Sequence, residues 1–184
     1  MPRVIYYTAC TLTGHLATEH NSLDWLLSIP QDDAVAGIDD FTRGMGVMVE
    51  GSATYEWVVR QGGLVEQPSL WQEWYGDRPT FVFTTREQVV IPGADVRFRS
   101  GSVASAWPEI VAAAGDRDVW LVGGGDLVGQ FLDAGHLDEI VITYAPATLA
   151  GGKPLLPRDL GADRLTLTKV RQVGAFAELT YTVR

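Results

Sequence analysis

Segments with the composition of buried strands alternate with helix-like segments along most of this chain. Strand-like composition recurs at residues 3–10, 46–50, 80–85, 95–99, 119–122 and 137–145. Helical spacing of apolar residues, or capping residues, marks 34–44, 53–61, 102–114 and the stretch from 125 to about 134. This order predicts an α/β fold with a mainly parallel central sheet and helices on both faces. A last pair of strands, 164–172 and 175–183, is expected to be antiparallel.

The connecting segments divide into polar, aromatic and irregular loops. Residues 11–33 are polar, and residues 146–162 are irregular and rich in Pro and Gly. The segment 64–79 is predicted to be a loop that carries Trp71, Trp74 and Tyr75. These rings suit a lid or an interface, and they suit a core equally well. No repeat or linker interrupts the chain, so residues 1–184 are expected to form one domain.

Composition excludes several classes of function. Fourteen basic and 23 acidic residues give a net charge of −9, which disfavours sequence-independent binding to nucleic acid. Cys10 is the only cysteine and the three histidines match no metal-ligand spacing, so we expect no metal site. No apolar run of about 18 residues predicts a membrane span, and the apolar N-terminus is interpreted as a strand rather than a signal peptide. We therefore expect a cytoplasmic protein.

Two strand-to-helix turns carry glycine where a ligand would bind. The first reads Val-Glu-Gly-Ser-Ala-Thr at 49–54, and the second reads Leu-Val-Gly-Gly-Gly-Asp at 121–126. A helix N-terminus offers free N–H groups and the positive end of the helix dipole, and glycine lets a phosphate approach the backbone. Both turns would lie at the carboxyl ends of parallel strands, where ligands of such sheets bind. The alternative is that these glycines only form tight turns. Neither turn carries the Rossmann or the Walker A pattern.

Polar side chains at neighbouring strand ends extend this candidate site. Thr84, Thr85 and Arg86 end one strand, and two hydroxyls with a guanidinium suit a phosphate monoester. Arg97 and Arg99 are candidates for the same positive surface, although solvated arginines are the simpler interpretation. Residues 21–40 hold five aspartates and no basic residue, which is typical of a solvated acidic face. Among them Asp24, Asp39 and Asp40 are candidate acids or bases. No serine lies in the context of a nucleophile elbow.

Four segments carry a resemblance to a known family. They are TLTGHLATEHNSLDWL at 11–26, GSATYEW at 51–57, GDRPTFVFTTR at 76–86 and VWLVGGGDLVGQFLDAGHLDEIVITYAPATLAGGKPLLP at 119–157. At these residues the chain resembles the dihydrofolate reductase-like superfamily. It is most similar to the reductase domain of the riboflavin-biosynthesis deaminase–reductase and to its free-standing bacterial relatives. The resemblance implies a three-layer fold over nearly the whole chain, and a homodimer.

The resemblance also implies NADPH as cofactor and gives roles to particular residues. The 2′-phosphate would meet Thr84, Thr85 and Arg86, and the nicotinamide would contact Ala9 and Leu16. The residues that would flank the pyrophosphate are Gly51, Ser52, Thr54, Gly123, Gly124, Gly125, Asp126 and Leu127. Thr143 would lie beneath the substrate, with Trp25 and Asp39 as further substrate-binding candidates.

Two positions depart from the family pattern. Ser52 stands where the family often has arginine, and Thr13 stands where the family usually has aspartate. A threonine forms hydrogen bonds but is no base at neutral pH, so Thr13 and Asp24 are both retained as catalytic candidates. The first hypothesis is an NADPH-dependent reductase of a pyrimidine-, pterin- or flavin-related heterocycle, as in 5-amino-6-(5-phosphoribosylamino)uracil reductase. The alternative is a nucleotide- or metabolite-binding protein without turnover. A true dihydrofolate reductase is disfavoured, because its Trp-Asp pocket pattern is not found.

Overall fold

A sheet of eight strands forms the centre of the computed structural model, which describes residues 1–30, 38 and 40–184. Its strands are β1 (Val4–Thr11), β3 (Met45–Gly51), β4 (Thr80–Phe83), β5 (Val96–Arg99), β6 (Asp118–Gly123), β7 (Glu139–Ala145), β9 (Leu165–Val173) and β10 (Phe176–Val183). They lie in the order β5-β4-β3-β6-β1-β7-β10-β9. The first six of that order run parallel, and β10 is antiparallel to both β7 and β9. The predicted parallel sheet with an antiparallel C-terminal pair is confirmed.

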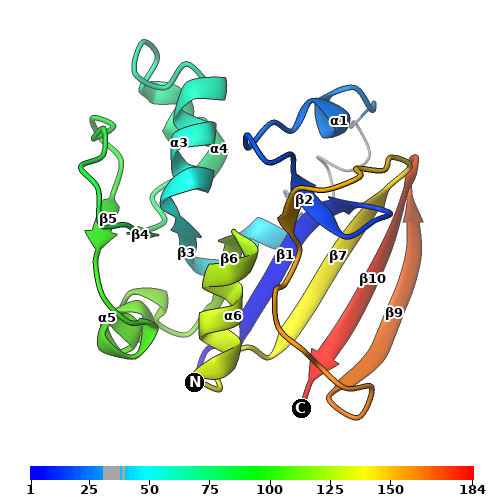
Figure 1. Ribbon diagram of the computed structural model, residues 1–184. Helices are drawn as coiled ribbons and strands as arrows, with labels where there is room; N and C mark the ends of the chain where they lie inside the picture. The colour runs from blue at the N-terminus through cyan, green and yellow to red at the C-terminus, as the bar shows by residue number, and fades with distance from the viewer. Residues whose placement is uncertain (31–37, 39) are drawn as a thin grey trace.

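Helices cover both faces of the sheet, as expected for strands that are apolar on both sides. On one face α5 (Val103–Ala114) and α6 (Gly125–Asp133) pack against alternate residues of β1, β3 and β6. On the other face α3 (Ser52–Gln61) and α4 (Ser69–Tyr75) pack against β4. Figure 1 shows α6 beside β1 and the β9–β10 hairpin at the opposite side of the molecule from β5. The predicted three layers are therefore present.

The structure places helices or strands in three segments that were predicted to be loops. The segment 64–79 contains α4, because Trp71 and Tyr75 are spaced one helical turn apart and their rings lie 4.8 Å from each other. Trp71 is buried in the core while Trp74 is half exposed. The polar loop 11–33 contains β2 (His15–Ala17) and the one-turn helix α1 (Asp24–Leu27). The irregular stretch 146–162 supplies β8 (Lys153–Pro154), which pairs with β2.

Other predicted boundaries agree with the structure to within a few residues. Ser102 caps α5 by accepting a hydrogen bond from the Ser105 N–H, and Gly115 ends that helix. Gly174 turns β9 into β10 with a φ of 56°. Residues 34–37 and 39 of the predicted helix 34–44 fall outside the described residues, and its residues 38 and 40–43 are helical. Both chain termini lie at the end of the molecule opposite α1 (Figure 1). No helix among the described residues is long and apolar enough to cross a membrane.

Candidate functional site

A cavity of about 870 Å³ opens at the carboxyl ends of the parallel strands. Its floor is formed by β1 and β7, and its sides by the turns that follow β3, β4 and β6. The structure brings most of the predicted site residues to its lining: Ala9, Leu16, Gly51, Ser52, Thr54, Thr84, Thr85, Gly123, Gly124, Gly125, Asp126, Leu127 and Thr143. Residues from five different strand ends therefore face a single space, as is typical of ligand sites in open parallel sheets.

The two glycine turns lie side by side at one end of this cavity. Gly51 is the N-cap of α3 and Gly124 is the N-cap of α6, and neither helix has a side-chain cap. By contrast, the serine at the start of α5 caps its own helix. A Cβ built on Gly51 would lie 3.7 Å from the backbone nitrogen of Gly124, so the two turns nearly touch. Two helix N-termini without side-chain caps thus lie beside each other at the cavity, which favours an anion.

Close approach explains the third glycine of the second turn. A Cβ on Gly125 would collide with the carbonyl oxygen of Pro154 and would lie 2.5 Å from that of Leu155. The segment that includes β8 therefore rests directly on the first turn of α6. Gly123 has a φ of 139°, a conformation that other residues rarely adopt. Glycine is required at both positions by the backbone, independently of any ligand.

The basic residues near the cavity are held by acidic partners. Arg86 donates to the Ser52 hydroxyl at 2.9 Å and pairs with Glu56 at 2.9 Å, but it is not part of the cavity lining. Arg99 lines the cavity and is paired with Glu109. Arg97 is turned toward Asp95 and does not line the cavity. Of the three arginines considered for a phosphate surface, Arg99 therefore lines the cavity, whereas Arg86 and Arg97 lie outside its lining.

The predicted catalytic residues lie outside the cavity lining. The Thr13 hydroxyl donates to the Leu149 carbonyl at 2.8 Å and accepts from the Leu149 N–H at 3.0 Å, so it joins two loops. Asp24 is exposed at the start of α1. Trp25 is partly buried, and its indole nitrogen lacks a hydrogen-bond partner among the described residues. Asp39 lies outside the described residues. Asp126 is the one carboxylate among the described residues that line the cavity.

A buried polar network at the other end of the cavity was not predicted. Tyr7 lines the cavity, and its hydroxyl donates to the Glu178 carboxylate at 2.8 Å. Arg171 donates to the same carboxylate from Nε at 2.5 Å and from Nη2 at 3.1 Å. Glu178 is 3% exposed and lies opposite Thr143 in the β7–β10 ladder. Burial alone would raise the pKa of Glu178, but hydrogen bonds from Arg171 and Tyr7 lower that pKa below its usual value.

The phenol of Tyr7 is correspondingly hard to ionise. Burial is the largest cause that raises the pKa of Tyr7 to about 12, and the hydrogen bond and charge of Glu178 add to it. A hydrogen bond with Thr143 lowers this pKa in part. In the last strand the buried positions alternate at Phe176, Glu178 and Thr180. This pattern could not be read from the sequence, because the apolar residues Leu179, Tyr181 and Val183 alternate on the opposite face. Nothing in the sequence indicated that β10 would lie beside the cavity floor.

The arrangement of sheet, cavity and glycine turns defines a class of protein. It is the reductase-domain form of the dihydrofolate reductase-like fold, which solved structures share over this entire chain. Residues 2–177 match the family described as the RibD C-terminal domain. The chain therefore belongs to that family.

Relatives and solved structures show how widely this fold matches. YwjB of Bacillus subtilis (strain 168) is 27% identical over 179 residues, which cover 97% of each chain. A Shewanella sp. PV-4 protein, described as a candidate riboflavin biosynthesis protein, shares 25% identity over 99% of each chain, with a TM-score of 0.76. A pyrimidine reductase-like protein of Corynebacterium diphtheriae has a TM-score of 0.69 at 14% identity, over all of this chain and 92% of its own.

A larger relative contains this fold as one part. The Thermotoga maritima diaminohydroxyphosphoribosylaminopyrimidine deaminase/5-amino-6-(5-phosphoribosylamino)uracil reductase has a TM-score of 0.68 at 15% identity. The match covers all of the present chain and 57% of the Thermotoga chain. At this level of identity the likeness shows the fold alone.

Proposed function

We propose that this protein is an NADPH-dependent reductase of a small heterocyclic molecule. The observation that carries the proposal is the pair of uncapped helix N-termini, those of α3 and α6, which meet at one cavity. A pyrophosphate has two phosphates to place, and each N-terminus suits one of them. Membership of the RibD C-terminal domain family supports the same cofactor.

The residues present fit a dinucleotide in one orientation. Gly51 and Gly124 leave open backbone at the turns, as a pyrophosphate requires. Arg86 and Arg99 lie to one side, at the ends of β4 and β5, where they would hold a 2′-phosphate. Ala9 lies on the other side, on β1, and would contact the nicotinamide. When bound there, a reduced nicotinamide supplies a hydride to a polarised double bond.

The substrate would lie beyond the nicotinamide, over β1 and β7. Apolar side chains, including Trp120, Val122 and Phe176, line the cavity there together with the hydroxyl residue Thr143. Apolar walls with a few polar groups suit a flat heterocycle. A pyrimidine-, pterin- or flavin-related compound fits this description. The names of the Corynebacterium and Thermotoga proteins, both pyrimidine-related reductases, support the same class.

Fluorescence titration with NADPH and with NADH tests the cofactor. We expect NADPH to bind. Arg86→Ala should weaken the affinity for NADPH by about tenfold or more, since a charged hydrogen bond to phosphate contributes about 1.5–3 kcal/mol. The affinity for NADH should change little, because NADH has no 2′-phosphate. Arg97→Ala is the matched control, because Arg97 lies on the neighbouring strand and faces Asp95 instead of the cavity. Absence of binding of either cofactor at millimolar concentration contradicts the proposal.

The second candidate is a nucleotide- or metabolite-binding protein without turnover. It is favoured by the placement of Thr13, whose hydroxyl is engaged by the Leu149 backbone on both its donor and its acceptor side. Oxidation of NADPH in the presence of a panel of aminouracils, pterins and flavins distinguishes the two. Turnover at ordinary enzyme rates eliminates the binding-only function. Tight NADPH binding with no oxidation of NADPH across the panel supports it.

A further inference from the structure

The polar end of the cavity is built from three strands that are far apart in the sequence. Tyr7 lies on β1, Thr143 on β7 and Glu178 on β10, and these strands are neighbours in the sheet. The ladders pair Ala9 with Thr143 and Thr143 with Glu178, so these side chains project from the same face. The Tyr7 ring therefore extends across β7 toward Glu178, along the floor of the cavity. Trp120 fixes the strand beneath it by donating from Nε1 to the Tyr7 carbonyl at 3.1 Å.

The direction of each hydrogen bond follows from the charges. Glu178 is bound by Arg171 through two nitrogens, which keeps the carboxylate ionised and leaves it able only to accept. The Tyr7 hydroxyl must therefore donate its proton to Glu178 and cannot offer it to the cavity. Toward the cavity, the phenolic oxygen of Tyr7 can therefore only accept a hydrogen bond. The Thr143 hydroxyl interacts with the same phenol and also lines the cavity.

We propose that Tyr7, oriented by Glu178 and Arg171, is a specificity-determining residue that accepts a hydrogen bond from a ring N–H of the substrate. The substrate is then a heterocycle with an amide-like N–H at the edge that faces β1 and β7. A compound that offers only acceptors at that edge would leave the acceptor capacity of the Tyr7 oxygen toward the cavity unused and would place two acceptors against each other. This inference rests on the proposed function, and it specifies that the substrate must carry a hydrogen-bond donor at this edge.

The location of the network separates substrate recognition from cofactor recognition. The glycine turns follow β3 and β6, whereas Tyr7 and Thr143 lie on β1 and β7. Since neighbouring strands are about 4.8 Å apart, the two ends of the cavity are separated by roughly 10 Å. Glu178 and Arg171 are positioning residues, because neither is part of the cavity lining. Removal of the Tyr7 hydroxyl should therefore change substrate preference without changing NADPH affinity.

A matched pair of probes tests the proposal by calorimetry, with and without saturating NADPH. The probes are 6-aminouracil, which has two ring N–H groups, and 6-amino-1,3-dimethyluracil, which has none. We expect the wild-type protein to bind 6-aminouracil about tenfold more tightly than 6-amino-1,3-dimethyluracil, because the dimethyl compound loses one buried hydrogen bond. Tyr7→Phe should reduce this ratio to less than about threefold, and Glu178→Gln should reduce it in part, because the phenol then becomes free to donate.

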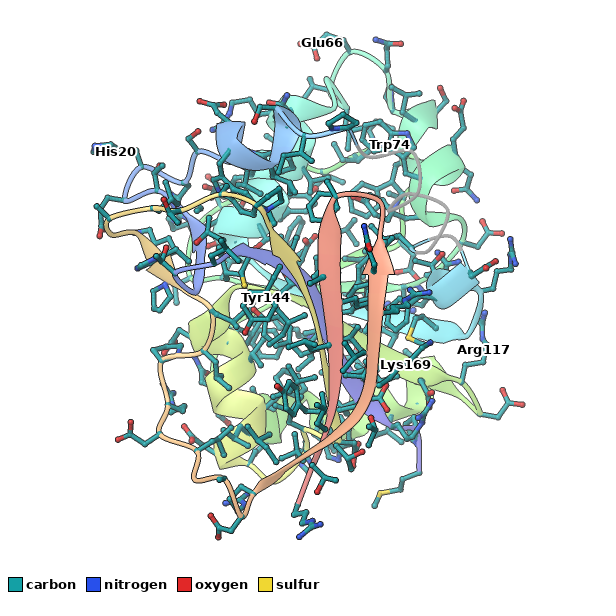
Figure 2. The ribbon with its side chains drawn as sticks, turned by 90° about the vertical axis from the view of Figure 1, so that its right-hand side faces the viewer. His20, Glu66, Trp74, Arg117, Tyr144 and Lys169 are labelled. Atoms are coloured by element: carbon teal, nitrogen blue, oxygen red, sulfur yellow. The ribbon has the colours of Figure 1, made fainter. Side chains whose placement is uncertain are left out.

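Tyr144→Phe is the control, since Tyr144, labelled in Figure 2, follows Thr143 on β7. Tyr144 is not part of the cavity lining. It should keep the wild-type ratio. If Tyr7→Phe does not fold, Thr143→Val tests the neighbouring hydroxyl and should also lower the ratio. The proposal is overturned if wild type binds neither probe, if it binds both equally, or if the folded Tyr7→Phe protein retains the ratio. The protein could also discriminate between the probes through Tyr7 and yet fail to bind NADPH. That result would support this inference and contradict the proposed reductase function.

Discussion

Two buried glutamates of this protein have opposite environments. Glu178 has Arg171 and Tyr7 as partners, which lower its pKa. Glu50, on β3 immediately before the first glycine turn, is 1% exposed, and burial raises its pKa to about 8. The Glu50 charge also raises the pKa of Tyr55 and Tyr75, after burial. Glu50 is therefore neutral in the folded protein at neutral pH, whereas Glu178 is ionised.

The raised pKa of Glu50 makes the stability of the protein depend on pH. In the unfolded chain this carboxyl ionises near its ordinary value of 4.5, whereas in the folded protein it holds its proton up to about pH 8. Between these values the unfolded state binds fewer protons, so Glu50 lowers the free energy of unfolding as pH rises, by at most about 1.4 kcal/mol per pH unit. Glu50→Gln removes this effect, and we expect the variant to gain stability over wild type from pH 5 to pH 8.

Urea unfolding at several pH values measures this difference. Glu66→Gln is the control, because Glu66 is exposed and should leave the pH dependence unchanged. A constant difference between wild type and Glu50→Gln from pH 5 to pH 8 would show that Glu50 titrates normally.

The two glycine turns combine a structural and a binding requirement at neighbouring positions. The backbone oxygens of Pro154 and Leu155 lie within 2.5 Å of the position that a Cβ on Gly125 would occupy. The nearest atom to a Cβ on Gly51, by contrast, is 3.7 Å away. An alanine at Gly125 must therefore displace the β8 segment from α6. An alanine at Gly51 fits the fold but narrows the space between the two helix N-termini.

Alanine substitutions separate these two requirements. Gly125→Ala should lower the free energy of unfolding by about 1–3 kcal/mol, as overpacking does. Gly51→Ala should change it by less than about 1 kcal/mol, the usual effect at an N-cap, and yet weaken NADPH binding. Urea unfolding together with NADPH titration distinguishes the two. Equal loss of stability in both variants would contradict the assignment of Gly51 to the cofactor site.

At the level of helices and strands, the sequence predicted those features that a local residue pattern determines. Alternating strands and helices predicted the parallel sheet, and glycine after an apolar strand predicted both turns. Helix α4 lies in a segment that was predicted to be a loop, although Trp71 and Tyr75 are four residues apart, as on one face of a helix. The pairing of β2 with β8 was missed because it joins loops more than 130 residues apart. The Tyr7–Glu178 contact spans 171 residues, a separation that no local pattern reports.

At the scale of the whole molecule, the net charge of −9 does not exclude an anionic ligand. The turns that would hold a pyrophosphate use backbone N–H groups, which contribute nothing to the charge sum. The basic side chains nearby, Arg86 and Arg99, are each oriented by one glutamate. The local arrangement of backbone N–H groups and arginines is therefore more informative about anion binding than the net charge is.

The outer strand of the sheet provides the last prediction, a homodimer. β9 is the edge strand beyond β10, and a register shift between Thr180 and Tyr181 places Leu167 opposite Tyr181 and Val170 opposite Leu179. Leu179 and Tyr181 project from the same face of the sheet, so Leu167 and Val170, which lie opposite them, project from that face too. Leu167 is 50% exposed and Val170 is 62% exposed. Figure 2 shows this hairpin along its length, with Lys169 on the outer strand.

An exposed apolar edge of this kind tends to be covered by another chain. We therefore expect light scattering after size exclusion to give twice the chain mass of 20.1 kDa for the wild type. Val170→Glu places a charge in the middle of this apolar face, and it should shift the protein to 20.1 kDa without loss of folding. Arg117→Glu, a charge change outside the β9–β10 hairpin, is the control and should leave the mass unchanged. A wild-type mass of one chain, or a Val170→Glu dimer as stable as wild type, would show that this face is not the interface.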